Sequence, residues 1–395
     1  MHTNQLLDIK KNTCRDLVCF SHLRWDFVYQ RPQHLMSRFA QQFRTFFIEE
    51  PLFHEAEDSL QTKSTKENVW IVTPYLNSAT TDKQSVVTRQ KQLLNILFAE
   101  KKIEKFIAWY YTPMALKISS HLKPQVIVYD CMDELSAFKF APAELKIMEA
   151  ELFSKAQVVF TGGHSLYVAK KHAHRDIYPF PSSIDKVHFS NGRKQLNEPG
   201  DQQHIPRLRF GFYGVIDERF DIQMIKEVAE KRPDWQLVLI GPVVKINPAD
   251  LPKLPNIHYL GSKCYNDLPL YLSGWDFAMI PFEKNESTKY ISPTKTPEYL
   301  AAGKPVISTS ITDVVAPYGK KKLVYIADNS DDFIASAEKE LAKNNQQTKR
   351  WLSRVDAFLK DFSWDYTVAQ MMEKINDCMV EENSTNRVRK LKSVA

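Results

Sequence analysis

Short apolar runs alternate with longer helical patterns along most of this chain, and that alternation predicts its fold class. Residues 32–43 and 89–105, which lie between such runs, carry apolar side chains at helical spacing. Strands that alternate with helices indicate parallel β/α units in an open α/β sheet. The apolar runs that we predict as strands of the first half are residues 17–21, 45–48, 69–73, 106–110, 126–129, 158–160 and 177–180.

A polar, turn-rich segment at residues 190–207 interrupts the alternation, which then restarts. Because this segment has almost no apolar pattern, it is the best candidate for a linker. A chain of 395 residues also suits two domains better than one core. We therefore predict a first α/β domain over residues 1–190, a second over 205–362, a last helix over about 364–380 and a basic flexible tail over 381–395.

The glycines and cysteines exclude several classes of protein. All eleven glycines lie after residue 161, so the first half cannot carry the G-x-G-x-x-G turn of a dinucleotide-binding domain. No G-x-x-x-x-G-K-[ST] phosphate loop, H-E-x-x-H pair or Cys/His cluster at metal-ligand spacing occurs. The five cysteines are scattered and odd in number, which predicts reduced thiols in a cytoplasmic protein.

The segment SPTKTPEYLAAGKPVIST, residues 292–309, predicts a short helix followed by a buried strand. Thr294 or Thr296 can cap this helix, and Gly303 falls where a left-handed residue ends it. The start of the helix, with Lys295 beside it, is suited to a phosphate, and Glu298 one turn later can accept hydrogen bonds from sugar hydroxyls. The alternative is an ordinary capped helix with a surface lysine and glutamate.

This segment resembles the donor-nucleotide helix of GT-B glycosyltransferases of the family 1/family 4-like group, in which EYLAAGKPV recurs. The resemblance implies two Rossmann-like domains that face each other across a cleft, with the last helix crossing back to the first domain. It implies a nucleoside-diphosphate sugar, UDP- or GDP-linked, as donor, and no metal or other cofactor. The glutamate at the place of Glu298 holds the ribose in that family. Many family 4 members carry a second glutamate eight positions earlier, where this chain has Tyr290.

The same resemblance extends the donor site to other loops. The first loop of the second domain lies against the donor diphosphate in the family, which selects Gly214 and the basic Arg219 here. Arg219 and Lys295 would then be two cations that face two phosphates, with Thr296 beside them. In the family a loop of the first domain at this place faces the cleft, so the resemblance implies that His164 bonds a donor phosphate. The open alternative is a His164 that is merely exposed.

The string WDFVYQRPQHL, residues 25–35, joins the first predicted strand to the first predicted helix. Ligands of α/β sheets bind at that edge, and aromatic faces with polar groups suit sugar rings. The string resembles a subgroup of bacterial transferases for exopolysaccharide and teichuronic-acid-type cell-wall polymers. We expect Trp25, Tyr29, Arg31 and His34 to bind the acceptor. The alternative for Arg31 is a solvated residue at a helix start.

Three carboxylates follow the strand predicted from residue 126, namely Asp130, Asp133 and Glu134. Crowding of like charges raises the pKa of at least one carboxyl group, which suits a general base toward an acceptor hydroxyl. We predict Asp133, Asp130 or Asp26 as that base. The alternative is a set of acids in the first turn of a helix.

Together these features predict a metal-independent glycosyltransferase of cell-surface polysaccharide synthesis, with a glycan or lipid-linked acceptor. A GT-B nucleotide-sugar epimerase and a non-catalytic module that binds a glycan or a partner remain alternatives. The net charge of +6 and the basic stretches at 89–105 and 320–322 are compatible with peripheral contact with an anionic inner membrane. We expect a cytoplasmic protein and no nucleic-acid partner.

Overall fold

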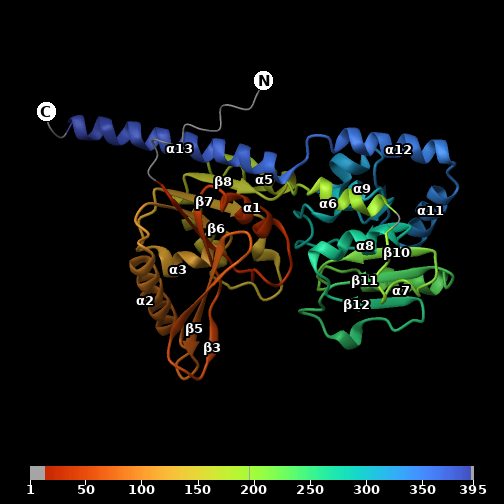
Figure 1. Cartoon of the computed structure of the whole chain (residues 1–395), viewed down its shortest axis with the longest axis horizontal. Helices are drawn as coiled ribbons and strands as arrows, with labels where there is room; N and C mark the ends of the chain where they lie inside the picture. The colour runs from red at the N-terminus through yellow and green to blue at the C-terminus, as the bar shows by residue number, and fades with distance from the viewer. Residues whose placement is uncertain (1–13, 195, 393–395) are drawn as a thin grey trace.

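Two β-sheets, one from each half of the chain, lie beside each other along the long axis of the molecule (Figure 1). The computed structural model describes residues 14–194 and 196–392. We call the first sheet with its helices the first lobe, and the second sheet with its helices the second lobe. The alternation in the sequence predicted this pair of α/β sheets.

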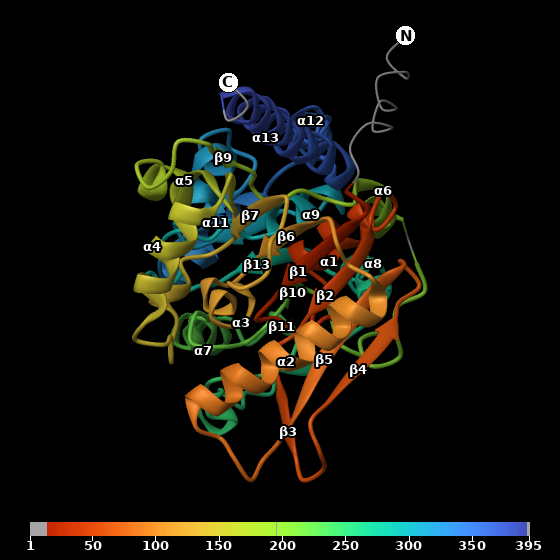
Figure 2. The same cartoon turned by 90° about the vertical axis from the view of Figure 1, so that its left-hand side faces the viewer.

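The first sheet has the strand order β3-β5-β2-β1-β6-β7-β8-β9, and β4 pairs antiparallel with β5. Every residue of β1 and β6 is buried, as expected for parallel strands covered on both faces. The strands are β1 (Asp16–Phe20), β2 (Arg44–Ile48), β3 (Leu52–His54), β4 (Ser59–Ser64), β5 (Val69–Asn77), β6 (Phe106–Tyr110), β7 (Val126–Cys131), β8 (Val158–Thr161) and β9 (Ile177–Pro179). The helices are α1 (Arg31–Phe39), α2 (Lys83–Lys101), α3 (Leu116–Ser119), α4 (Leu145–Lys155) and α5 (His164–Lys170). In Figure 2, α2 crosses in front of β5.

The second sheet is parallel throughout, with the order β12-β11-β10-β13-β14-β15. Its strands are β10 (Arg209–Tyr213), β11 (Gln236–Ile240), β12 (Ile257–Gly261), β13 (Phe277–Ile280), β14 (Val306–Ser308) and β15 (Tyr325–Ile326). The helices of this half are α6 (Lys186–Ser190), α7 (Ile222–Lys231), α8 (Leu268–Ser273), α9 (Lys295–Ala301), α10 (Thr312–Val314), α11 (Ser330–Leu341) and α12 (Asn345–Phe358).

The last helix, α13 (Trp364–Lys392), leaves the second lobe and packs on the first (Figure 1). Its buried side chains, including Trp364, Met371 and Ile375, belong to one core cluster with residues of β1, β6 and β7. The helix continues to Lys392, so residues 381–392 are helical where we expected a flexible tail. No glycine or proline interrupts the sequence between Trp364 and Lys392, which explains the continuation. Residues 393–395 lie outside the described part of the chain.

Met371 tests how strongly α13 is bound to the first lobe, because its side chain is fully buried. Met371→Ala should lower the free energy of unfolding by about 2–5 kcal/mol, through lost apolar contact and an unfilled cavity. Scanning calorimetry should show a lower midpoint for this variant. Glu373→Ala, on the exposed side of the same helix, should leave the midpoint unchanged. Equal shifts in the two variants would contradict the packing of α13 described above.

Candidate active site

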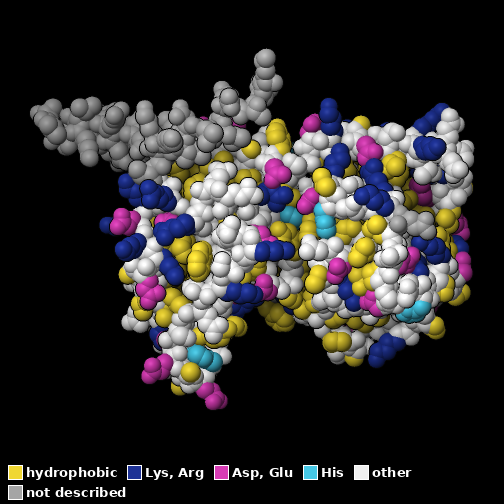
Figure 3. All heavy atoms as spheres, viewed as in Figure 1, with side chains coloured by type: hydrophobic (Ala, Val, Ile, Leu, Met, Phe, Trp, Pro, Cys, Tyr) yellow, Lys and Arg dark blue, Asp and Glu magenta, His cyan; other side chains and the backbone are white. Residues whose placement is uncertain are grey.

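A cleft of about 960 Å³ lies between the two lobes, and residues of both lobes line it. The hollow between the lobes opens on the lower side of Figure 3. Loops at the carboxyl ends of β1, β7, β10, β11 and β12 contribute to its walls, together with the start of α9. Because ligands of open α/β sheets bind at this edge, the cleft is the candidate active site.

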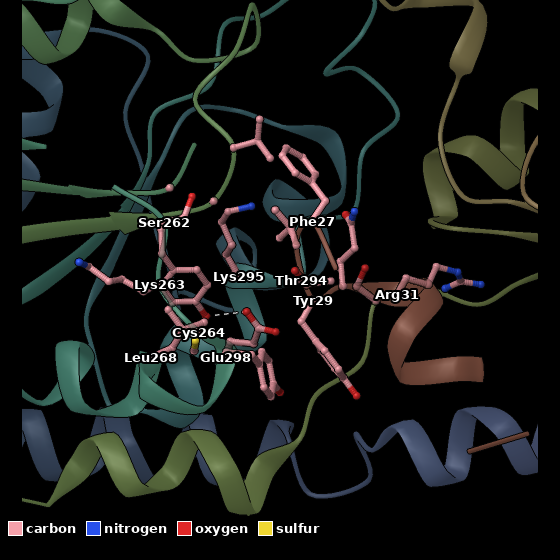
Figure 4. A pocket seen from close by; sticks show the side chains of 18 of the residues that line it. Phe27, Tyr29, Arg31, Ser262, Lys263, Cys264, Leu268, Thr294, Lys295 and Glu298 are labelled. Atoms are coloured by element: carbon pink, nitrogen blue, oxygen red, sulfur yellow. Dashed lines mark hydrogen bonds between the residues drawn. The ribbon is translucent and has the colours of Figure 1, made fainter. Parts of the chain in front are cut away.

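Helix α9 contributes Lys295 and Glu298 to the second-lobe wall, and both side chains extend into the cavity (Figure 4). The helix is held in place because Tyr299 and Leu300, on its other side, are completely buried. Thr294 occupies the N-cap position, but its side chain makes no cap hydrogen bond. The predicted helix is therefore present, without the predicted cap.

The end of β10 holds Glu298 in its place. The Tyr213 hydroxyl donates a hydrogen bond of 2.5 Å to the Glu298 carboxylate, and the Tyr299 hydroxyl accepts one of 3.0 Å from the backbone N–H of Tyr213. Burial raises the pKa of Glu298, while Tyr213 and Lys295 oppose that rise. A carboxylate with one firm donor and open acceptor positions can accept hydrogen bonds from ligand hydroxyls.

Gly214 allows Lys295 to reach the cleft. Its φ is +139°, and a Cβ at this position would lie 2.3 Å from the Lys295 Cε atom, so a larger residue would be strained and would displace the lysine. The Nζ atom lies 5.6 Å from the ring centre of Phe212 and 5.7 Å from that of Phe282. Burial and the charge of Arg219 lower the pKa of Lys295.

Arg219 supplies a second cation to the same wall. Its guanidinium donates hydrogen bonds to both carboxylate oxygens of Asp217, from Nε to Oδ1 at 2.9 Å and to Oδ2 at 3.1 Å, and from Nη2 to Oδ2 at 2.6 Å. Nη1 makes no hydrogen bond with any residue that the structure describes. Two cations, a backbone opened by Gly214 and the Glu298 carboxylate thus face one cavity, which suits a diphosphate attached to a hydroxyl-bearing group.

Of the carboxylates after β7, only Asp133 lines the cleft. Asp130 is completely buried and receives bidentate hydrogen bonds from Arg31, at 3.0 Å from Nε and 2.8 Å from Nη2. Glu134 pairs with Lys170 at 2.8 Å. Burial raises the pKa of Asp133 to about 6, against the opposing effect of Arg219. The structure therefore keeps the Asp130 carboxylate in the core and places Asp133 in the cleft wall.

The loop after β1 is divided between the cleft and the core. Tyr29 lines the cleft and packs against Tyr265 of the second lobe, with ring centres 4.5 Å apart. Asp26 also lines it, in an exposed ion pair of 2.8 Å with Lys63. Trp25 borders the cleft, although its ring is buried against Phe47.

Arg31 and His34 were expected to bind an acceptor, and the structure gives both another environment. The Arg31 guanidinium is bound to Asp130 in the core and points away from Lys295 and Glu298 (Figure 4), although Arg31 still forms part of the cleft wall. His34 is buried and stacks on Trp364 at 4.7 Å, outside the cleft lining. Burial lowers the pKa of His34 well below its usual range, so the ring is neutral.

Two predicted donor contacts also lie outside the cleft lining. His164 is exposed at the start of α5, and Asp313 of the second lobe binds the neighbouring Ser165 backbone N–H at 2.9 Å. Thr296 is completely buried, and its hydroxyl has no partner among the described residues. The first side chain faces solvent and the second faces the core, so neither is placed to touch a ligand in the cleft.

Sequence reasoning missed several residues of the cleft. Tyr213, the last residue of β10, lines the cleft and holds Glu298, while Asp217, four residues further on and outside the lining, holds Arg219. Both lie close enough to Gly214 that its loop could have indicated them. Lys63 at the end of β4 and Lys66 in the turn between β4 and β5 also line the cleft. The approach of this turn depends on strand pairing that no local motif indicates.

The buried Arg31–Asp130 pair provides a test of how the start of α1 is held against the end of β7. Arg31→Met should lower the free energy of unfolding by about 3–5 kcal/mol, because it leaves the Asp130 carboxylate buried and unpaired. A double variant with Asp130→Leu should recover much of that loss, since no unpaired charge remains. Urea unfolding followed by circular dichroism measures both. A double variant that is less stable than Arg31→Met would contradict this explanation.

Comparison with known families finds a match in the second lobe. Residues 210–344, which contain Arg219, Lys295 and Glu298, match the family described as glycosyl transferases group 1. A putative teichuronic acid biosynthesis glycosyltransferase, TuaH of Bacillus subtilis (strain 168), is 26% identical over 287 residues, which are 68% of this chain and 72% of that protein.

Two solved structures have the same fold. One, described as trehalose-6-phosphate from E. coli bound with UDP-2-fluoro glucose, has a TM-score of 0.65 at 10% identity and covers 92% of this chain and 99% of its own. The other, Anabaena HepE in complex with UDP and glucose, has a TM-score of 0.62 at 14% identity and covers 91% and 99%. Residues 210–344 of the second lobe thus resemble the group 1 glycosyltransferases, and the whole chain has the GT-B fold of these solved structures, as predicted.

Proposed function

We propose that this protein is a glycosyltransferase that moves a sugar from a UDP- or GDP-linked donor to a hydroxyl of a glycan or lipid-linked acceptor in cell-surface polysaccharide synthesis. The observation that carries the proposal is the meeting of Lys295, Arg219 and Glu298 on one wall of a cleft with Asp133 on the other. Two fold relatives contain UDP or a UDP-sugar, which favours UDP. The likeness to TuaH favours a cell-wall polymer as product.

The donor half of the reaction follows from the charges of the second-lobe wall. The diphosphate binds between Lys295 and Arg219, close to the backbone at Gly214, and Glu298 accepts hydrogen bonds from the ribose. When the bond between the anomeric carbon and the phosphate oxygen breaks, negative charge develops on the leaving diphosphate. Cations already in place stabilise that charge without reorganisation, which lowers the barrier.

The acceptor half uses the first-lobe wall. Tyr29 and the exposed part of Phe27 give apolar surface to a sugar ring, and Asp133 lines the same cleft. Asp133 takes the proton of the acceptor hydroxyl while the acceptor oxygen forms its bond to the anomeric carbon. Asp26 is the weaker candidate for this step, because it is exposed and paired with Lys63.

A non-catalytic binding module is the second candidate, and Tyr290 is the observation in its favour. This residue stands where many family 4 members have a second glutamate, and it packs against the core of the first lobe. The cleft then lacks one carboxylate at the sugar. Release of UDP from UDP-glucose by the purified protein would exclude this candidate, whereas conversion to another UDP-sugar without an acceptor would indicate an epimerase.

We place the reaction on the cytoplasmic side of the membrane. The five cysteines are odd in number and scattered along the sequence, as is usual for a protein of a reducing compartment. No helix in the described part of the chain is long and apolar enough to cross a bilayer. Contact with an anionic membrane surface through the basic stretches 89–105 and 320–322 stays a proposal, tested by salt-dependent sedimentation with anionic liposomes.

Binding of UDP by calorimetry tests the donor site. Lys295→Met should weaken the binding of UDP by about 10- to 100-fold and leave the binding of uridine unchanged, because a charge-assisted contact to phosphate is lost. Glu298→Ala should weaken the binding of both UDP and uridine, because both contain the ribose. Glu286→Ala, exposed and outside the cleft lining, is the control. A wild-type protein that binds neither UDP nor GDP would contradict the proposed function.

The pH dependence of turnover tests the role of Asp133. The group must be ionised to accept a proton, so kcat/KM should rise with pH through about 6 and then level off. Asp133→Asn should lower kcat by about 10²- to 10⁴-fold and remove this rise. UDP release from UDP-glucose measures both. If the rise persists in Asp133→Asn and disappears in Asp26→Asn, then Asp26 is the base.

A further inference from the structure

The segment that follows Asp133 belongs to the first lobe and contacts the second. It passes through a short 3-10 helix, Leu135–Ala137, and ends at Phe138 and Lys139. The Lys139 ammonium donates a hydrogen bond of 3.4 Å to the Lys245 carbonyl of the second lobe. This segment therefore connects the candidate base with the opposite wall of the cleft.

Phe138 lies between two cations of the second lobe. The Cζ atom of Arg219 is 5.4 Å from its ring centre, and the Nζ atom of Lys245 is 5.2 Å away. These distances are within the range of cation–π attraction, which arises from the negative face of the ring. Phe138 is half-buried and does not line the cleft, so it is placed to act through Arg219 and not on a substrate directly.

The partners of Arg219 explain why an aromatic ring suits this position. Asp217 binds Nε and Nη2 from the same loop, which leaves Nη1 for a ligand. A carboxylate in place of Phe138 would also take Nη1 and neutralise the cation. The ring holds the guanidinium without using any of its N–H groups, so the charge stays available to a phosphate.

Resting on the proposed function, we propose that Phe138 is a positioning residue for the donor diphosphate, which it serves from the opposite lobe by holding Arg219 at the cleft. Because the same short segment carries Asp133, closing the lobes would place the base and order the diphosphate-binding cation together. Donor affinity then depends on the electronic character of a side chain that does not contact the donor.

Progressive fluorination of the Phe138 ring tests this dependence, because fluorine weakens the negative face with little change in size. Calorimetry with UDP should show affinity falling stepwise from phenylalanine through difluoro- to trifluorophenylalanine, and by about 3- to 10-fold in Phe138→Leu. Phe138→Tyr should retain most of the affinity. Uridine, which has no phosphate, should bind equally to all variants.

Phe140 provides the matched control. It is 78% exposed and also has a lysine near its ring, with Lys139 Nζ at 5.2 Å, but in the described part of the chain the cation–π contact with Arg219 comes from Phe138. The same fluorination series at Phe140 should leave UDP affinity unchanged. In an Arg219→Gln background, the Phe138 series should also lose its effect, because the cation that it positions is gone.

Each outcome decides the inference. If the wild-type protein binds UDP and the fluorinated Phe138 variants bind it with the same affinity, this inference is overturned and the proposed function stays intact. If Phe138→Leu lowers the affinities for uridine and for UDP equally, Phe138 has a merely structural role, and this inference is also overturned. A wild-type protein that binds none of UDP, GDP and inorganic pyrophosphate overturns the proposed function and this inference together.

Discussion

The position of one short helix governs the chemistry of this molecule. Helix α9 carries Lys295 and Glu298 one turn apart, and the tip of β10 holds both: Tyr213 donates to the carboxylate, and Gly214 leaves room for the lysine stem. A seven-residue helix is not stable alone, so the buried Tyr299 and Leu300 must fix it against the second sheet. The direction of both charged groups follows from that packing.

Partly buried charges of this kind are costly to keep without a partner. Burial raises the pKa of Glu298 and of Asp133 and lowers that of Lys295, so each charged form is disfavoured in the free protein. A ligand that brings phosphates to the cations and hydroxyls to the carboxylate offsets that cost. The same dry environment strengthens the cations toward the charge that develops on a leaving diphosphate.

Much of the fold could be predicted because it depends on local pattern. Alternation of apolar runs and helical spacing indicated both sheets, and the residues around Glu298 indicated the helix that carries the proposed donor site. The side-chain directions at loops could not be predicted in the same way. Asp130 and Asp133 are only three residues apart, yet Asp130 is buried at the end of β7 and Asp133 lines the cleft. The difference depends on Arg31, which pairs with Asp130 and comes from a helix distant in the sequence.

The other differences have the same physical origin. His34 lies under Trp364, and that contact exists only because α13 returns to the first lobe. Thr296 faces inward, since the apolar side of α9 includes its position, while His164 faces solvent. The β4–β5 turn reaches the cleft through pairing between strands. Each of these outcomes depends on contacts between segments far apart in sequence.

A crystal structure of the chain with UDP bound tests the central claim most directly. The account predicts phosphate oxygens within hydrogen-bond distance of the Lys295 Nζ and Arg219 Nη1 atoms, with ribose hydroxyls on the Glu298 carboxylate. A nucleotide bound elsewhere, or one in this cleft whose phosphates leave both cations untouched, would contradict it.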